Sequence, residues 1–225
     1  GLIDNFENDK SLKTNIITIL EWTLNNQNDI GEWQNLYEVP YFNLKYGWTS
    51  AMGQGLGISF LVRCYFLKIY NNPNDILEKI SKAKDALLQD KHMSIVNKSI
   101  ILQEYENTDF SVLNGAVFAL YGLRDYDLIN KTVLFEKYSS HLANVFHKYN
   151  FSLIWSKYSL NGIISSKFYH KLHVEMMSSM FFLTKNKLFI KDLKFWKLGI
   201  YMAPIFLIIK GLQKVINFKT VNVHP

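Results

Sequence analysis

Apolar residues recur at three- and four-residue steps along most of the chain, a spacing that places side chains on one face of an α-helix. The pattern predicts helices over about residues 9–26, where Leu12, Ile16 and Leu20 recur, and over residues 51–68. A third helix is expected from Pro73, a residue favoured at the first helical position, to about residue 89. Further helices are predicted over residues 113–126, 131–147, 168–184 and 189–217, the last with a kink near Pro204.

The segments between these helices contain little that predicts a sheet. Residues 93–111 are irregular, with one short extended piece expected at about residues 100–105. Helices of this length, joined by alternating short and long loops, predict an all-α fold of antiparallel helix pairs, as in an incomplete α/α barrel or toroid. In a toroid the long loops gather at one end, so we expect them to form a cleft there.

Two segments have an unusual local composition. Residues 27–50, called the aromatic loop below, combine helix breakers with aromatic rings and are expected to form an ordered loop over the cleft. The helix that follows carries Gly53, Gly55 and Gly57, which lower helix propensity and need the close approach of a neighbouring helix or a ligand. Its GQGLG sequence resembles a dinucleotide-binding fingerprint only weakly, because no strand precedes it.

The length of 225 residues suits one well-packed domain, so residues 1–225 are expected to form a single unit. Its end, residues 198–217, is predicted to be a terminal helix that is both apolar and basic. The apolar run from Leu198 to Ile209 is too short to span a bilayer and contains Pro204. A buried terminal helix is the favoured interpretation, and peripheral membrane contact is the alternative.

Composition narrows the classes of partner. The formal net charge of +6 favours anionic partners such as acidic glycans, anionic lipids or nucleic acid. No run of lysine and arginine has the density of a nucleic-acid-binding arm, so nucleic acid is not expected. The single cysteine, Cys64, excludes an intrachain disulfide and a thiolate metal cluster, and its apolar surroundings are typical of a core residue.

Four separated segments resemble, in the same order, the C-terminal domain of the D-glucuronyl C5-epimerases. They are GWTSAMGQGLGISFLVRCY at residues 47–65, LQEYE at 102–106, VLNGAVFALYGLRDY at 112–126, and WSKYSLNG with SSKFYHKLHV within 155–174. With the intervening helices, the resemblance covers roughly residues 9–197. It implies an α/α-toroid domain that converts D-glucuronyl to L-iduronyl residues in heparosan or a similar glycan, without a cofactor or metal.

The resemblance also implies the catalytic residues. The family's acid–tyrosine pair falls on Glu104 and Tyr105, and its tyrosine–histidine pair falls on Tyr169 and His170. Epimerisation at carbon 5 removes a hydrogen beside a carboxylate and returns a proton to the opposite face, so two acid/base groups should flank the sugar. We expect Glu104 or Tyr105 on one face and Tyr169 on the other, with the assignment of base and acid left open.

Substrate-binding residues are expected around these groups. Removal of the hydrogen builds negative charge on the substrate carboxyl, which requires hydrogen-bond donors or a cation. Candidates for that role are Tyr158, His170, His173, Asn114 and Arg63. Aromatic rings stack on sugars and polar side chains bond their hydroxyl groups. Contacts to the glycan are therefore expected from Trp48, Ser50 and Gln54, and from Trp33 and Tyr41 in the aromatic loop.

Several of these residues also have a purely structural interpretation. Without the resemblance, Tyr169 would be placed at the edge of the core, because it begins an apolar helical stripe. His170 and His173 could share a helix face as metal ligands, but no third ligand has a matching spacing, so no metal site is expected. Asn114 could cap the helix that begins beside it.

Three positions depart from the family's pattern. Ser159 stands where aspartate is common, Asn161 where some members have arginine, and Glu106 where proline is common. The first two weaken the expected stabilisation of charge, and Glu106 adds a negative charge near an anionic substrate. They support an alternative, a non-catalytic glycan-binding or glycan-assembly protein on an epimerase scaffold. A uronate polysaccharide lyase is a further alternative, since the same carbanion can expel the substituent at carbon 4.

The expected partner is an anionic polysaccharide or a lipid-linked glycan, and a homodimer is left open. A composition rich in asparagine, isoleucine and lysine suggests a bacterial polysaccharide locus. That favours the bacterial cytoplasm or the membrane periphery, with the Golgi lumen as the expected place in a eukaryote.

Overall fold

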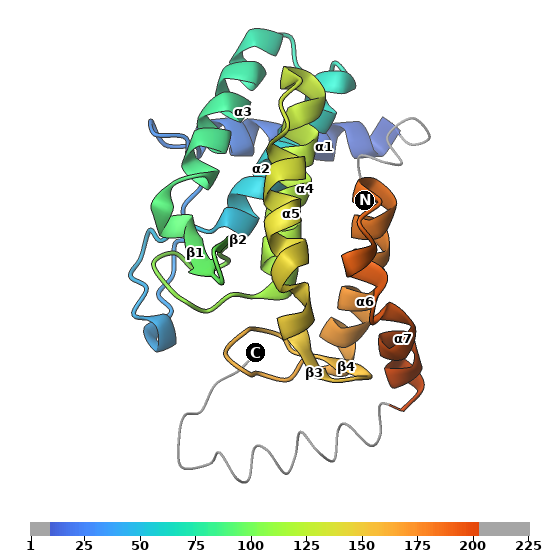
Figure 1. The fold of residues 1–225 in the computed structure, drawn as a ribbon. Coiled ribbons are helices and arrows are strands. Elements are labelled where there is room, and N and C mark those ends of the chain that lie inside the picture. Colours follow the sequence, from blue (N-terminus) through green and yellow to red (C-terminus); the bar gives the residue numbers. More distant parts are fainter. Residues whose placement is uncertain (1–9, 203–225) are drawn as a thin grey trace.

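The computed structural model describes residues 10–202, and this part of the chain is mostly helical (Figure 1). Its α-helices are α1 (Lys10–Asn25), α2 (Ala51–Phe66), α3 (Pro73–Leu87), α4 (Leu113–Asn130), α5 (Leu134–Val145), α6 (Lys167–Thr184) and α7 (Leu193–Tyr201). The short 3₁₀ helices are η2 (Pro40–Phe42), η3 (Asp90–His92), η4 (Phe146–Tyr149) and η5 (Lys187–Ile190). Two antiparallel hairpins pair β1 (Met93–Val96) with β2 (Ser99–Leu102) and β3 (Asn150–Ser152) with β4 (Trp155–Ser156).

Most predicted helices are observed close to their expected ends. The segment predicted as a helix over residues 189–217 differs, because it begins as η5 and α7 starts only at Leu193. Asn186 Oδ1 accepts the Leu188 backbone N–H at 3.0 Å, a local side-chain bond that competes with regular helix formation. The predicted kink near Pro204 lies outside the described residues.

The β1–β2 hairpin was predicted only as a single extended piece. Its turn residues, Asn97 and Lys98, both have left-handed backbone angles, with φ of 48° and 65°. A two-residue turn of this kind matches the twist of antiparallel strands and usually carries glycine at its second position. Lysine stands there instead, so the sequence lacked the signal that normally marks such a hairpin.

Helices α2 and α4 contact each other through their glycines. A Cβ atom at Gly55 would lie 2.7 Å from the Ala119 Cα atom, and one at Gly122 would lie 2.4 Å from the Gly55 Cα atom. The two backbones therefore touch, and the prediction that the glycines of α2 allow the close approach of a neighbouring helix is confirmed for Gly55. Gly57 serves the aromatic loop in the same way, because a Cβ atom there would lie 2.4 Å from the Trp33 ring.

Helices α2, α4 and α6 all begin at the same end of the molecule (Figure 1). The first backbone N–H of α2 donates to the Gln103 carbonyl oxygen at 3.0 Å, and Gly115 in the first turn of α4 faces Glu104. In the first turn of α6, the Tyr169 ring contacts the Tyr158 ring. Three helix N-termini therefore meet at the segments that contain Glu104 and Tyr158.

No helix within residues 10–202 is long and apolar enough to cross a membrane. Only the first residues of the terminal helix predicted over 198–217 are described. Helix α7 ends at Tyr201, where the side chains of Leu198 and Tyr201 are exposed. The rest of that predicted helix lies outside the described residues.

The contact between α2 and α4 gives a stability prediction. Gly55→Ala is expected to lower the free energy of unfolding by about 1–3 kcal/mol, because its methyl group meets the backbone of α4. The matched control is Gly53→Ala in the same helix, where the nearest atom to the added Cβ lies 3.7 Å away, on Ser50.

The control substitution should be neutral or stabilise by up to about 1 kcal/mol, since alanine favours a helix more than glycine does. Urea unfolding followed by circular dichroism measures both variants. Equal free energies of unfolding for the two would contradict the backbone contact.

Candidate active site

Four of the candidate residues lie together at the end where α2, α4 and α6 begin. Glu104, Tyr105, Tyr158 and Tyr169 form a group that we call the tyrosine cluster. The ring centroids of Tyr158 and Tyr169 are 4.8 Å apart with an interplanar angle of 62°, and the Glu104 charge acts on both Tyr105 and Tyr158. The Tyr105 ring is surrounded by the rings of Phe42, Trp48 and Phe110, at centroid distances of 4.3, 5.7 and 6.2 Å.

Glu104 is buried, with 8% of the residue exposed, and its Oε2 atom has no hydrogen-bond partner among the described residues. The carboxyl lies against α4, because a Cβ atom at Gly115 would come within 2.6 Å of Oε2. Burial raises the pKa of Glu104 to about 7, against a smaller opposing effect of the hydrogen bond with Tyr105. The carboxyl can therefore both accept and donate a proton near neutral pH.

The hydroxyl groups of Tyr105 and Tyr158 interact with each other and with Glu104. Side-chain hydrogen bonding links Tyr105 to Glu104, and its effect on both groups is that expected when the phenol donates to the carboxyl. Side-chain hydrogen bonding also links Tyr105 to Tyr158. Burial raises the pKa of both phenols, and the Glu104 charge raises them further, so both are protonated at neutral pH.

His170 follows Tyr169 in sequence but faces the core. Its Nδ1 accepts the Ser156 backbone N–H at 3.2 Å, so Nε2 carries the proton and donates to the Trp196 carbonyl oxygen at 2.9 Å. The imidazole stacks on Trp155 with ring centroids 4.0 Å apart, and burial lowers its pKa to about 4. Both ring nitrogens have partners within the protein, so the structure gives His170 a packing role and leaves it no nitrogen for substrate.

His173 lies behind Tyr169, with the two ring centroids 6.4 Å apart. Its Nδ1 is 2.9 Å from Ser156 Oγ, while its buried Nε2 has no hydrogen-bond partner among the described residues. Burial lowers its pKa to about 3, so the ring is neutral at pH 7. Within residues 10–202, no group of three or more histidine, cysteine or carboxylate side chains is arranged to hold a metal ion.

Two of the predicted glycan contacts use their polar groups inside the protein. Ser50 is the N-cap of α2 and accepts the Gly53 N–H at 3.3 Å. Gln54 is fully buried, and its amide exchanges two hydrogen bonds with the Trp33 backbone, at 3.1 and 3.3 Å. Trp48 differs, because its ring borders the tyrosine cluster while its indole N–H donates to the Tyr37 carbonyl oxygen.

Arg63 lies outside the cluster. It is roughly 20 Å along α2 from Ser50 at about 1.5 Å per residue, and its guanidinium pairs with Asp125 at 2.9 Å. Its expected contact with the substrate carboxyl stays a prediction from the family resemblance. Asn114 lies in the first turn of α4 beside the cluster, where it is buried, makes no capping bond and leaves Oδ1 without a partner in the described part of the chain.

Comparison with known proteins identifies the family of this chain. The family model described as "D-glucuronyl C5-epimerase C-terminus" matches residues 27–198, which is most of the chain. The chain belongs to this family. The D-glucuronyl C5-epimerase of Caenorhabditis elegans is 33% identical over 113 residues, 47% of this chain and 18% of the worm protein. The match therefore spans less than a fifth of that relative's length.

Two departures from the epimerase family's pattern lie close to the cluster. Ser159 is fully buried, and its hydroxyl has no partner among the described residues. Asn161 is exposed and lines a pocket of about 460 Å³ together with Val96, Asp109, Ser111, Lys148, Lys157 and Leu160. Two lysines and one aspartate give this pocket a positive charge, and its Lys157 directly precedes Tyr158.

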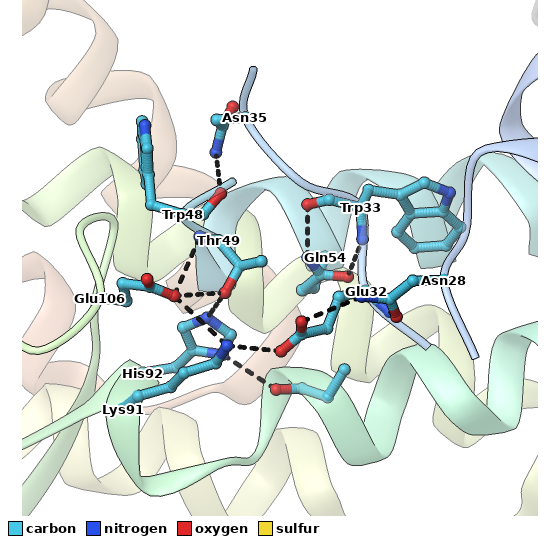
Figure 2. Close-up of polar contacts among 11 residues, drawn as sticks. Asn28, Glu32, Trp33, Asn35, Trp48, Thr49, Gln54, Lys91, His92 and Glu106 are labelled. Carbon is cyan, nitrogen blue, oxygen red and sulfur yellow. Dashed lines mark hydrogen bonds and ion pairs between the residues drawn. The ribbon is translucent and has the colours of Figure 1, made fainter. Parts of the chain in front are cut away.

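The third departure, Glu106, does not present an isolated charge to the substrate. Its carboxylate accepts hydrogen bonds from the Thr49 N–H and hydroxyl and pairs with Lys91 (Figure 2). The network also contains Thr49, Lys91 and His92, none of which was predicted from the sequence as a site residue. Thr49 stands within the GWTS segment, between two residues that were singled out there, so only its polar neighbours in space distinguish it.

The raised pKa of Glu104 gives a pH-dependent stability. A carboxyl whose pKa rises from 4.5 to about 7 on folding contributes stability below pH 4.5 that is lost as the pH rises through 7. Relative to wild type, Glu104→Gln, which cannot ionise, should therefore gain about 3 kcal/mol of unfolding free energy between pH 5 and pH 8.

Urea unfolding at the two pH values measures this difference. Glu136→Gln, at an exposed position of α5, is the control and should follow wild type. The same pH dependence in wild type and Glu104→Gln would show that the carboxyl titrates normally.

Proposed function

We propose that the chain is a polysaccharide uronate C5-epimerase, which converts D-glucuronyl to L-iduronyl residues in an anionic polysaccharide or lipid-linked glycan. One observation carries the proposal: a buried glutamate with a pKa of about 7 lies among three tyrosines, in a chain of this family. Inversion at carbon 5 leaves the oxidation level of that carbon unchanged, so acid/base groups alone suffice for the chemistry.

The proposed reaction uses Glu104 with Tyr105 on one face of the sugar and Tyr169 on the other. Ionised Glu104 takes the proton from carbon 5, and the electron pair of the broken C–H bond is delocalised into the carboxyl group. The Tyr169 hydroxyl then gives a proton to the opposite face of carbon 5. The proton held by Glu104 returns to Tyr169 through Tyr105, Tyr158 or solvent, which restores the starting state.

The negative charge that builds on the substrate carboxyl needs stabilisation. Some family members have an arginine at the position where this chain has Asn161. Helices α2, α4 and α6 present their N-termini at this end, and helix N-termini favour negative charge. Buried Asn114 and Ser159 have atoms without protein partners there, and Lys148 and Lys157 line the neighbouring pocket. We assign charge stabilisation to these groups in place of the arginine.

We further propose that the helices form part of an incomplete α/α toroid in one domain, with the cluster in its cleft. The helix pairs support this arrangement, because α2, α4 and α6 run in one direction while α3 and α5, which alternate with them along the chain, run in the opposite direction (Figure 1). The net charge of +6 agrees with a polyanionic partner. Location at a membrane periphery and self-association into a dimer remain proposals from the sequence.

A second candidate is a non-catalytic glycan-binding or glycan-assembly protein. It is favoured by Asn161, whose side chain lacks the charge that some family members place there, and by Ser159. A uronate lyase shares the carbanion but expels the substituent at carbon 4, which would give a new absorbance band from an unsaturated uronate.

Deuterium incorporation at carbon 5 tests the proposal. Wild-type protein in heavy water with a heparosan-type polymer should exchange the carbon-5 hydrogen, as measured by NMR. Tyr169→Phe should reduce this exchange by at least about 100-fold, because it removes one of the two acid/base groups. Tyr201→Phe, at a position that is 84% exposed, is the control and should match wild type.

Three outcomes separate the candidates. Exchange that survives in Tyr169→Phe would refute the role of that residue. An unsaturated product would indicate a lyase. The absence of exchange with any uronate polymer, from folded protein that still binds glycan, would favour the non-catalytic candidate.

A further inference from the structure

A buried polar network surrounds Glu106, the residue that replaces the family's proline (Figure 2). Glu106 Oε2 accepts the Thr49 backbone N–H at 2.9 Å and the Thr49 hydroxyl at 2.6 Å, and it pairs with Lys91 Nζ at 3.3 Å. Lys91 pairs at the same time with Glu32, whose side chain is only 4% exposed. One lysine thus links two carboxylates that belong to distant parts of the chain.

The same network holds both ends of the aromatic loop. Near the start of the loop, the Glu32 backbone N–H donates to Asn28 Oδ1 at 2.8 Å, and the Glu32 side chain is paired with Lys91. Near its end, Thr49 is tied to Glu106 by two hydrogen bonds. The loop is therefore fixed at two points to the segment that leads from η3 to Glu106.

His92 also belongs to this network, in which it contacts the Thr49 side chain. Its Nδ1 is 2.9 Å from the Ala86 carbonyl oxygen, which can only accept, so Nδ1 carries a proton. Its Nε2 is 2.8 Å from the Thr49 hydroxyl, which is also bonded to Glu106. The single hydroxyl proton of Thr49 thus lies between two acceptors, while the Thr49 backbone N–H belongs to Glu106 alone.

The position of these bonds in the sequence connects them to the tyrosine cluster. Thr49 directly follows Trp48, and Glu106 directly follows Tyr105. Pairing Thr49 with Glu106 therefore brings Trp48 and Tyr105 side by side, with ring centroids 5.7 Å apart. The Trp48 indole N–H, bonded to the Tyr37 carbonyl oxygen, fixes the orientation of that ring.

We propose that Glu106, Thr49 and His92 are positioning residues, which hold the aromatic loop and its Trp48 ring against Tyr105 and so set the place of that tyrosine beside Glu104. This inference rests on the function proposed above and adds to it a role for Glu106 that is specific to this chain. Glu106, which departs from the family's pattern, then stabilises the site. Its charge is paired within the protein and is not presented to the substrate.

The charges of the network predict its response to pH. Burial raises the pKa of Glu106, but hydrogen bonds from Thr49 and the charge of Lys91 outweigh burial and hold it below its usual range. Burial lowers the pKa of His92, against the opposing effects of the Ala86 carbonyl and the charges of Glu106 and Glu32. Both groups therefore stabilise the folded network above their usual pKa values, and this stabilisation is lost as the pH falls.

The test compares paired variants without substrate. Thr49→Val and Glu106→Gln should increase hydrogen exchange of the residue 31–50 amides at least about tenfold and shift the Trp48 indole N–H resonance. Thr49→Ser retains the hydroxyl and should behave as wild type. Glu38→Gln is the second control, since Glu38 is an exposed acid of the same loop. Glu106→Gln should also lower the pKa of His92, measured by NMR titration, because it removes a facing negative charge.

The second part uses a uronate polymer that wild-type protein turns over. In Thr49→Val and Glu106→Gln, kcat for carbon-5 exchange should fall about tenfold while KM changes less, because Tyr105 is displaced. Unchanged loop exchange, Trp48 resonance and His92 titration in both variants would overturn the inference. These measurements need no turnover, so they decide it even where no polymer is a substrate and the proposed function itself fails.

Discussion

The contact between the α2 and α4 backbones is the constraint on which the candidate site depends. At Gly55 and Gly122 the two helices approach to a distance that no side chain would allow. Because both helices start at the same end, the close contact also brings their first turns together. The segment that contains Gln103 and Glu104 fits against both of these turns, through the first N–H of α2 and through Gly115. The burial of Glu104, and hence its raised pKa, follows from the packing of two helices.

That burial costs stability. Glu104, Asn114 and Ser159 each have a buried polar atom without a hydrogen-bond partner in the described part of the chain. Each such atom costs roughly 1–3 kcal/mol, which a fold tolerates only where the surrounding packing holds the group in place. The concentration of these atoms beside three tyrosines distinguishes this end of the helices. Polar groups that bind a ligand lack hydrogen-bond partners in the free protein, because the ligand supplies the missing hydrogen bonds.

The sequence predicted the helices and the residues of the tyrosine cluster better than it predicted the directions in which the side chains point. Periodicity located the helices, and the family resemblance selected Glu104, Tyr105, Tyr158 and Tyr169. It also selected His170, which faces the core while Tyr169 faces the cluster, because successive helical residues point in directions about 100° apart. Periodicity predicts local structure, so it could not predict a contact between distant segments such as that of Thr49 with Glu106. The hairpin turn at Asn97 was missed for the lack of a glycine.

The electrostatics of the two networks explain how an extra carboxylate is tolerated beside the tyrosine cluster. Glu106 is ionised at neutral pH, yet Lys91 and the Thr49 N–H balance its charge at short distance. Glu104 lies two residues away with no cation beside it, and its hydrogen bond with Tyr105 does not offset burial, so its pKa is raised. The same residue type therefore has opposite pKa shifts at two neighbouring positions, because hydrogen bonds and a cation outweigh burial at Glu106 but not at Glu104. Of these two carboxyls, only Glu104 changes its protonation near pH 7, whereas Glu106 stays ionised there and its hydrogen bonds with Thr49 tie the aromatic loop to the segment after Tyr105.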